Sequence, residues 1–184
     1  MTVQLHIGCG KRFLPGFVHI DVGDFPHVDH RRSAESLPMF ADESVDVIYA
    51  SHILQYYDRH EVRAALAEWR RVLKRGAILR LAVPDFPALV EVYRQSGSLA
   101  AILGPLYGRM KVEGGDERLI YHRTAYDFAT LEALLHEHGF ADVRRWDWRR
   151  TVHGDHDDFS QAYFPHMDRD HGLPISLNVE ATRR

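Results

Sequence analysis

Two neighbouring motifs near the start of the chain combine glycines with a carboxylate. Gly8 and Gly10 flank Cys9 directly after the apolar run of residues 3–7, and a second apolar run ends at Asp21. Glycine lets a backbone approach a ligand where a Cβ would collide, and a carboxylate at the end of the next strand can accept hydrogen bonds from both hydroxyls of a ribose. These motifs predict a site for a cofactor that contains adenosine.

The spacing of the motifs narrows the choice of cofactor. The nicotinamide fingerprint requires a third glycine where this chain has Phe13, and its acid lies further along the chain than Asp21. The phosphate-binding loop of nucleotide hydrolases requires Ser or Thr after Gly-Lys, and here Arg12 follows. Both of these cofactor classes are therefore disfavoured.

Histidines supply the candidates for a proton-accepting group. The chain contains 13 of them, and position must decide which ones could act. His52 follows the apolar run of residues 45–50, and His122 precedes a predicted helix that starts near Asp127. Imidazole is a natural general base because its pKa lies near neutral pH. We expect His122 or His52 to be catalytic, with a purely structural hydrogen bond as the other interpretation of His52.

The elements that position these residues follow from apolar patterning. Short apolar runs at residues 3–7, 17–22, 45–50 and 78–83 are typical of strands covered on both faces. A helix begins after Asp58, which Glu61 can cap reciprocally, and its apolar stripe runs from Val62 to Leu73. The alternation predicts an α/β fold with a mostly parallel sheet. Ligands then bind at the carboxyl ends of the strands, where Gly8, Asp21 and Ser51 would lie.

The second half of the chain adds a helix over residues 127–138, which Gly139 ends, and two strands near residues 143–148 and 175–182. We expect the last strand to run antiparallel. The segments 85–126 and 149–174 are long for connections between elements. We interpret the first as a lid insertion, with helices near 88–93 and 98–107 and a polar loop over 112–118. We interpret the second as an active-site loop. The whole chain, residues 1–184, is expected to form one domain.

Aromatic and basic residues in these segments suggest how an acceptor would be bound. Aromatic faces with polar tips suit sugars or small polar rings, although the same side chains could pack the lid. An arginine could pair with a phosphate on the acceptor. The predicted substrate-binding residues are Tyr56, Tyr57, Arg123, Tyr163 and His166.

Other residue patterns carry weaker predictions. The segment 153–158 is rich in His and Asp, but acidic loops commonly serve solubility, and we predict no metal site. Cys9 is the sole cysteine, and a small side chain supporting a turn explains it better than a nucleophile. With 184 residues, 45% of them hydrophobic, and a net charge of −3, the composition argues against a general nucleic-acid binder. No apolar run is long enough to span a membrane, so a cytoplasmic protein is expected.

Taken in order along the chain, the segments resemble those of the class I S-adenosylmethionine-dependent methyltransferases. The loop of residues 7–10, Asp21 and the segments 34–38, 45–52 and 71–84 are similar to the family's successive motifs. The resemblance implies a Rossmann-like fold with helices on both faces, S-adenosyl-L-methionine as cofactor, and methyl transfer to a hydroxyl or amine of a small-molecule acceptor. The cofactor-binding residues that it implies are Gly8, Cys9, Gly10, Asp21, Ser33, Ala34, Glu35, Ser51 and His52.

The chain departs from the family's pattern in three places. The helix usually found between the first two strands has no room before Asp21, Ser33 stands where an acid is common, and Gln55-Tyr56 replaces a common Glu-His pair. The shortened loop and the tail of residues 176–181 resemble short methyltransferase-like proteins encoded in surface-polysaccharide gene clusters. This implies a sugar or nucleotide-sugar acceptor in surface-glycan synthesis. A non-catalytic adenosyl-ligand-binding protein or partner subunit remains the alternative, and homo-oligomerisation is left open.

Overall fold

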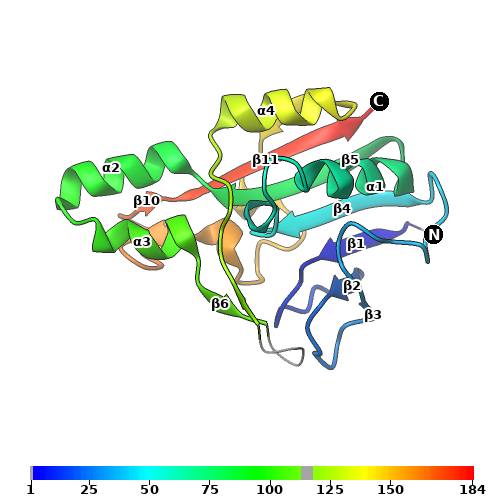
Figure 1. The fold of residues 1–184 in the computed structure, drawn as a ribbon, viewed down its shortest axis with the longest axis horizontal. Helices are drawn as coiled ribbons and strands as arrows, with labels where there is room; N and C mark the ends of the chain where they lie inside the picture. The colour runs from blue at the N-terminus through cyan, green and yellow to red at the C-terminus, as the bar shows by residue number, and fades with distance from the viewer. Residues whose placement is uncertain (1, 113–117) are drawn as a thin grey trace.

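The central feature of the structure, a computed structural model that describes residues 2–112 and 118–184, is a twisted sheet of seven strands in the order β3-β2-β1-β4-β5-β11-β8 (Figure 1). Residues 113–117, within the predicted polar loop, lie outside the described ranges. The strands of the sheet are β1 (Gln4–Ile7), β2 (Val18–Asp21), β3 (His30–Arg31), β4 (Val45–Ser51), β5 (Leu73–Pro84), β8 (Phe140–Arg145) and β11 (Ser176–Arg183).

The topology confirms the predicted mixed α/β fold with a mostly parallel sheet. β1 pairs in parallel with β2 and β4, β2 with β3, and β4 with β5. β11 inserts between β5 and β8 and is antiparallel to both, as expected for the last strand. The carboxyl ends of β1, β2 and β4 therefore meet at one edge, which brings the glycine turn, Asp21 and Ser51 to the same side of the molecule.

Two helices cover one face of this sheet. The helices α1 (Val62–Val72) and α4 (Phe128–Glu137) contribute Leu66 and Leu131 to a continuous apolar cluster with Ile48 and Leu81 of the strands. Trp69, fully buried on α1, donates its indole N–H to the Ala34 carbonyl at 2.8 Å. These two predicted helices thus supply apolar side chains that bury one face of the sheet.

Loops cover the opposite face of the sheet, where a second layer of helices was expected. Residues 8–17 form turns and no helix, as the short spacing predicted. Because side chains alternate along a strand, Tyr49 and Ala82 face this side, where they pack with Leu14, Phe17 and Trp146. Loop residues and aromatic side chains therefore close the face that the missing helix would cover.

The lid insertion consists of α2 (Phe86–Ser96), α3 (Ala100–Tyr107) and a hairpin of β6 (Met110–Lys111) and β7 (Leu119–Ile120). In Figure 1 the two helices project beyond the sheet, and the chain at β6 passes in front of the carboxyl ends of β1 and β2. The 149–174 loop carries a second small hairpin, β9 (Tyr163–Phe164) with β10 (Leu173–Pro174), which packs against α2. The helices were predicted, whereas both hairpins were not.

Two boundaries correct the sequence-based expectations. β5 begins at Leu73 instead of residue 78, so Leu73 belongs to the strand and not to the helix stripe. Asp58 and Glu61 do exchange their capping hydrogen bonds, at 2.8 and 3.1 Å, but in the turn before α1, which begins at Val62. In the described ranges no helix has the length and apolar character needed to cross a bilayer.

Candidate active site

The glycine turn after β1 is tied directly to the carboxylate at the end of β2. The Asp21 carboxylate accepts hydrogen bonds from the backbone N–H of Gly10 at 2.8 Å and of Gly23 at 2.7 Å. Both glycines of the turn have positive φ, +68° at Gly8 and +53° at Gly10. A Cβ on Gly8 would stand 2.6 Å from Ile53 Cδ1, whereas a Cβ on Gly10 would meet no atom within 4 Å. The turn is therefore packed against Ile53 at Gly8 and open at Gly10.

Cys9 lies between these glycines with its side chain buried. Its carbonyl accepts the N–H of Arg12 at 3.0 Å, which continues the turn. Burial, and then the nearby Asp21 carboxylate, raise the pKa of the Cys9 thiol to about 12. A thiol in this state is not a nucleophile at neutral pH, which supports the structural interpretation of this residue.

The segment after β3 lies against the end of the loop that follows β4. The Tyr57 hydroxyl donates to Glu35 at 2.8 Å, which joins a predicted cofactor-binding residue to a predicted acceptor-binding one. Ala34 is buried, whereas Ser33 is half-buried and Glu35 is exposed. The exposed Glu35 carboxylate is thus fixed in place and still faces solvent.

His52 directly follows Ser51, the last residue of β4, and occupies the left-handed region with φ of +54°. Its backbone N–H donates to the Ala82 carbonyl at 2.8 Å, and its Nε2 lies 3.0 Å from the Ser176 hydroxyl. The Ser176 hydroxyl in turn contacts Asn178 Oδ1 at 2.9 Å. Burial is the main cause that lowers the pKa of His52, to about 3. The imidazole is therefore neutral at neutral pH.

His122 lies close enough to His52 to contribute to the lowered pKa of that ring. Its Nδ1 donates to the Pro105 carbonyl at 3.0 Å, so its Nε2 carries the lone pair. That lone pair faces the Gln55 side-chain amide at 3.5 Å. Burial lowers the pKa of this ring as well. Both nitrogens of His122 thus face protein groups, and the ring links the insertion to the segment after β4.

The predicted acceptor-binding residues fall into two regions. Tyr56 packs edge-on against His122, with ring centroids 4.9 Å apart, and its hydroxyl contacts Met110 Sδ at 3.9 Å. Arg123 is held by Asp58 at 2.9 Å and by Glu61, at the start of α1.

The remaining two predicted residues lie in the hairpin under α2. The Tyr163 hydroxyl accepts a hydrogen bond from Arg149 at 3.0 Å, and the His166 side chain is exposed in the turn after β9. The structure brings Tyr56 against His122 and Tyr57 against Glu35, and it places Tyr163 and His166 in a separate hairpin.

The acidic segment 153–158 makes internal contacts. His153 is buried, with its ring 4.1 Å from that of Tyr49, and Asp158 accepts the Tyr49 hydroxyl. Asp157 pairs with Arg169 at 2.9 Å. Within the described ranges, no three potential ligands converge on a point where a metal ion could be held.

The contacts between the 149–174 loop and the site were missed by sequence reasoning. The Phe159 ring is tilted by 49° against that of His52, with centroids 5.5 Å apart, and the Arg12 guanidinium lies over the same Phe159 ring, 5.1 Å from its centroid. Asn178 donates to the Ser160 carbonyl at 2.9 Å. The alternation of Ser176 and Asn178 on one face of a strand was the only signal in the sequence, because their partners are far away along the chain.

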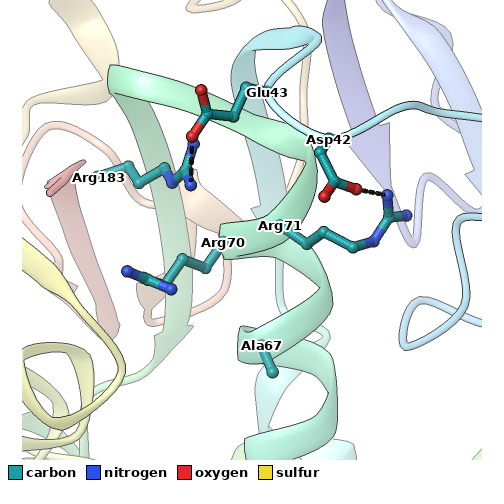
Figure 2. Close-up of a pocket in the computed structure, with 6 residues that line it drawn as sticks. All are labelled: Asp42, Glu43, Ala67, Arg70, Arg71 and Arg183. Carbon is teal, nitrogen blue, oxygen red and sulfur yellow. Dashed lines mark hydrogen bonds and ion pairs between the residues drawn. The ribbon is translucent and has the colours of Figure 1, made fainter.

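A separate recess lies at the opposite edge of the sheet, where α1 ends and β4 begins (Figure 2). Two ion pairs lie in the recess, Arg71 with Asp42 at 2.7 Å and Arg183 with Glu43 at 2.9 Å. Because cofactors of parallel α/β sheets bind at the carboxyl edge, this recess is a salt-bridged surface feature away from the candidate site. Its lining residues are Asp42, Glu43, Ala67, Arg70, Arg71 and Arg183.

Comparison with known proteins agrees with this architecture. A family model described as a methyltransferase domain matches residues 21–81, from the end of β2 into β5. A comparison with curated proteins gives no match.

Solved structures of S-adenosylmethionine-dependent methyltransferases share the fold. One from Methanosarcina mazei is 18% identical with a TM-score of 0.58, over 98% of this chain and 91% of that one. One from Archaeoglobus fulgidus is 15% identical with a TM-score of 0.59, over 99% and 86%.

A third similar structure, 1,6-didemethyltoxoflavin-N1-methyltransferase of Burkholderia thailandensis, contains S-adenosylhomocysteine. It is 14% identical with a TM-score of 0.57, over 98% of this chain and 70% of that one. At these identities the likeness establishes the fold. Together with the match of residues 21–81 to the methyltransferase-domain model, it shows that the chain has the fold of the S-adenosylmethionine-dependent methyltransferases.

Proposed function

We propose that this chain is an S-adenosylmethionine-dependent methyltransferase that acts on a hydroxyl or amine of a small polar acceptor, held at the carboxyl edge of the sheet beside His52. The observation that carries the proposal is the position of this neutral imidazole. It directly follows β4, the strand beside β1, and the glycine turn that binds Asp21 follows β1. Its strained φ of +54° is also typical of functional positions.

The residues at this edge fit S-adenosylmethionine. Each Asp21 oxygen accepts one backbone N–H and keeps a lone pair for a ribose hydroxyl, while the open side of Gly10 leaves room for the ligand. When bound, the cofactor supplies an electrophilic methyl group. The task of the protein is then to hold the acceptor in line and to exclude water.

Between the two candidate bases, position directly after the carboxyl end of β4 favours His52. Both nitrogens of His122 face protein groups, so we assign it the role of holding the insertion against Gln55. The His52 ring also contacts protein groups, the Ser176 hydroxyl at 3.0 Å and the Phe159 backbone, but it directly follows β4 at the carboxyl edge of the sheet. A pKa lowered to about 3 keeps the ring in the proton-accepting form but makes it a weak base. Such a base suits an acceptor that loses its proton only after the methyl group has been transferred, as an amine does.

For the acceptor, the polar aromatic side chains of Tyr56, against His122, and of Tyr57, against Glu35, support a sugar or another small polar ring. A role in surface-glycan synthesis rests on the resemblance of the shortened loop and the tail to that branch. Arg123 is already neutralised by two carboxylates, so a phosphate would have to displace one of them. Tyr163 and His166 would reach the acceptor only if the β9–β10 hairpin moved.

The test is a screen for turnover. The purified chain is incubated with S-adenosylmethionine and pools of hexoses, amino sugars, nucleotide sugars and small amines, and S-adenosylhomocysteine and methylated products are measured by mass spectrometry. Asp21→Asn removes one ribose-binding oxygen and should abolish the signal. Asp24→Asn, at a carboxylate whose side chain is 70% exposed, is the matched control and should keep it.

The alternative function is a non-catalytic protein that binds an adenosyl ligand. Its support is the low pKa of both imidazoles and the replacement of the common Glu-His pair by Gln55-Tyr56. Binding of S-adenosylhomocysteine without turnover of any pool would favour it. Steady turnover with any acceptor, lost in Asp21→Asn, would exclude it.

A further inference from the structure

A guanidinium with unused hydrogen-bond donors lies next to the glycine turn. Arg12 follows Gly10 by two residues, and its backbone N–H is fixed by the Cys9 carbonyl at 3.0 Å. Its side chain is half-buried, which for a cation normally requires a partner. No carboxylate in the described ranges pairs with it.

The Arg12 side chain is nevertheless held in one place by the 149–174 loop. Its Nε donates to the Asp157 carbonyl at 3.2 Å, and its guanidinium lies over the Phe159 ring, 5.1 Å from the centroid. These contacts use one donor and one face of the guanidinium plane. The two terminal nitrogens, which form the fork that binds carboxylates bidentately, have no hydrogen-bond partner in the part of the chain that the structure describes.

The location of this fork matches one end of the cofactor. Phe159 contacts both Arg12 and His52, so the guanidinium lies on the His52 side of the glycine turn, between the ends of β1 and β4. Asp21, which suits the ribose, lies on the β2 side of the same turn. The amino-acid end of an adenosyl ligand whose ribose is at Asp21 would therefore extend past Gly10 toward Arg12.

The local backbone explains why such a residue is needed here. In a strand–turn–helix unit the helix N-terminus offers free N–H groups and a partial positive charge to a bound anion. Residues 8–17 form only turns, so no helix N-terminus follows β1. A side-chain cation is the available replacement.

We propose that Arg12 binds the carboxylate of the methionine moiety of the cofactor, with Phe159 and the Asp157 carbonyl holding its guanidinium in position. This inference rests on the proposed function, because it requires an adenosyl ligand at Asp21. It makes the 149–174 loop part of the cofactor site, although it lies far from the glycine turn along the chain.

The experiment measures binding and not activity. Two ligands are titrated by calorimetry: S-adenosylhomocysteine and its decarboxylated analogue, S-adenosyl-3-thiopropylamine, which lacks only the carboxylate. The wild-type chain should bind the first about 10- to 100-fold more tightly, as expected for a charge-assisted bidentate contact. In Arg12→Gln that preference should disappear, through weaker binding of S-adenosylhomocysteine and unchanged binding of the analogue.

Three further variants separate recognition from folding. Arg12→Lys keeps the charge and loses the fork, so an intermediate preference is expected. Phe159→Leu removes the ring under the guanidinium and should weaken binding of S-adenosylhomocysteine about 2- to 5-fold without affecting the analogue. Arg59→Gln, at an exposed arginine before α1, is the matched control and should bind both ligands as the wild type does.

The outcomes are distinct. If Arg12→Gln weakens both ligands equally, Arg12 only shapes the loop and the inference is wrong; if the variant binds both as the wild type does, the carboxylate is held elsewhere and the inference is also wrong. If the wild-type chain binds neither ligand, the proposed function itself fails, and this inference fails with it.

Discussion

Replacing Gly8 with alanine tests the packing of the glycine turn against the segment after β4. A Cβ at this position would stand 2.6 Å from Ile53 Cδ1, and the backbone has φ of +68°. The left-handed conformation costs an alanine about 1–2 kcal/mol, and accommodating the overlap costs a further 1–3 kcal/mol, roughly. We expect Gly8→Ala to lower the free energy of unfolding by about 2–5 kcal/mol.

Two matched variants isolate the steric part of this cost. Gly10→Ala carries a similar backbone strain, with φ of +53°, but its Cβ would meet no atom within 4 Å, so about 1–2 kcal/mol is expected. Ile53→Val removes the clashing Cδ1 atom. It should cost about 0.5–1.5 kcal/mol in the wild-type chain and should recover about 1 kcal/mol in the Gly8→Ala background, a coupling that only contacting residues show.

The assay is urea unfolding followed by circular dichroism, with linear extrapolation to water. Comparable slopes of unfolding free energy against urea concentration among the variants would show that each still unfolds from a compact native state. The packing argument would be refuted by equal losses in Gly8→Ala and Gly10→Ala, or by strictly additive effects of Gly8→Ala and Ile53→Val.

Three further predictions concern the buried polar groups and the candidate base. Tyr49→Phe leaves the buried Asp158 carboxylate one hydrogen bond short and should cost about 1–3 kcal/mol in urea unfolding; a neutral result would contradict the role of this pair. Burial lowers the pKa of His153 from 6.5 to about 4, so the unfolded chain binds more protons as the pH falls from 6.5, and stability should drop by up to about 1.4 kcal/mol per pH unit. His153→Phe, which keeps a ring in contact with Tyr49 and removes two buried nitrogens that have no hydrogen-bond partner among the described residues, should flatten that slope in urea titrations from pH 7 to pH 4. His52→Asn, a residue that tolerates positive φ, should lower kcat by about 100-fold or more with an identified acceptor, whereas His122→Asn should act mainly through KM; the reverse pattern would exchange their roles.

Much of the fold could be predicted because it depends on local patterns. The apolar runs that became β1, β2 and β4 are short and bounded by polar residues, and the stripe of α1 repeats at helical spacing. The contact between Asp21 and the glycine turn also follows from topology, since parallel neighbouring strands bring their carboxyl ends together. These features needed no knowledge of distant contacts.

The features that escaped prediction depend on contacts between residues far apart in sequence. The contacts of Phe159 with His52 and with Arg12 depend on how the 149–174 loop folds back, which no local pattern encodes. The start of β5 at Leu73 was hidden because an apolar residue at that spacing also continues a helix stripe. His122 was expected to be catalytic from its place in the chain, while its hydrogen bonds to Pro105 and Gln55 became visible only in three dimensions.

The most direct measurement of the central claim is a calorimetric titration of the chain with S-adenosylmethionine and S-adenosylhomocysteine. The account predicts saturable binding of both to the wild type and to Asp24→Asn, and a loss of binding in Asp21→Asn, whose side chain offers one acceptor oxygen fewer at the ribose. Absence of binding to the wild type, or unchanged binding in Asp21→Asn, would contradict the assignment of the cofactor site to the glycine turn and Asp21.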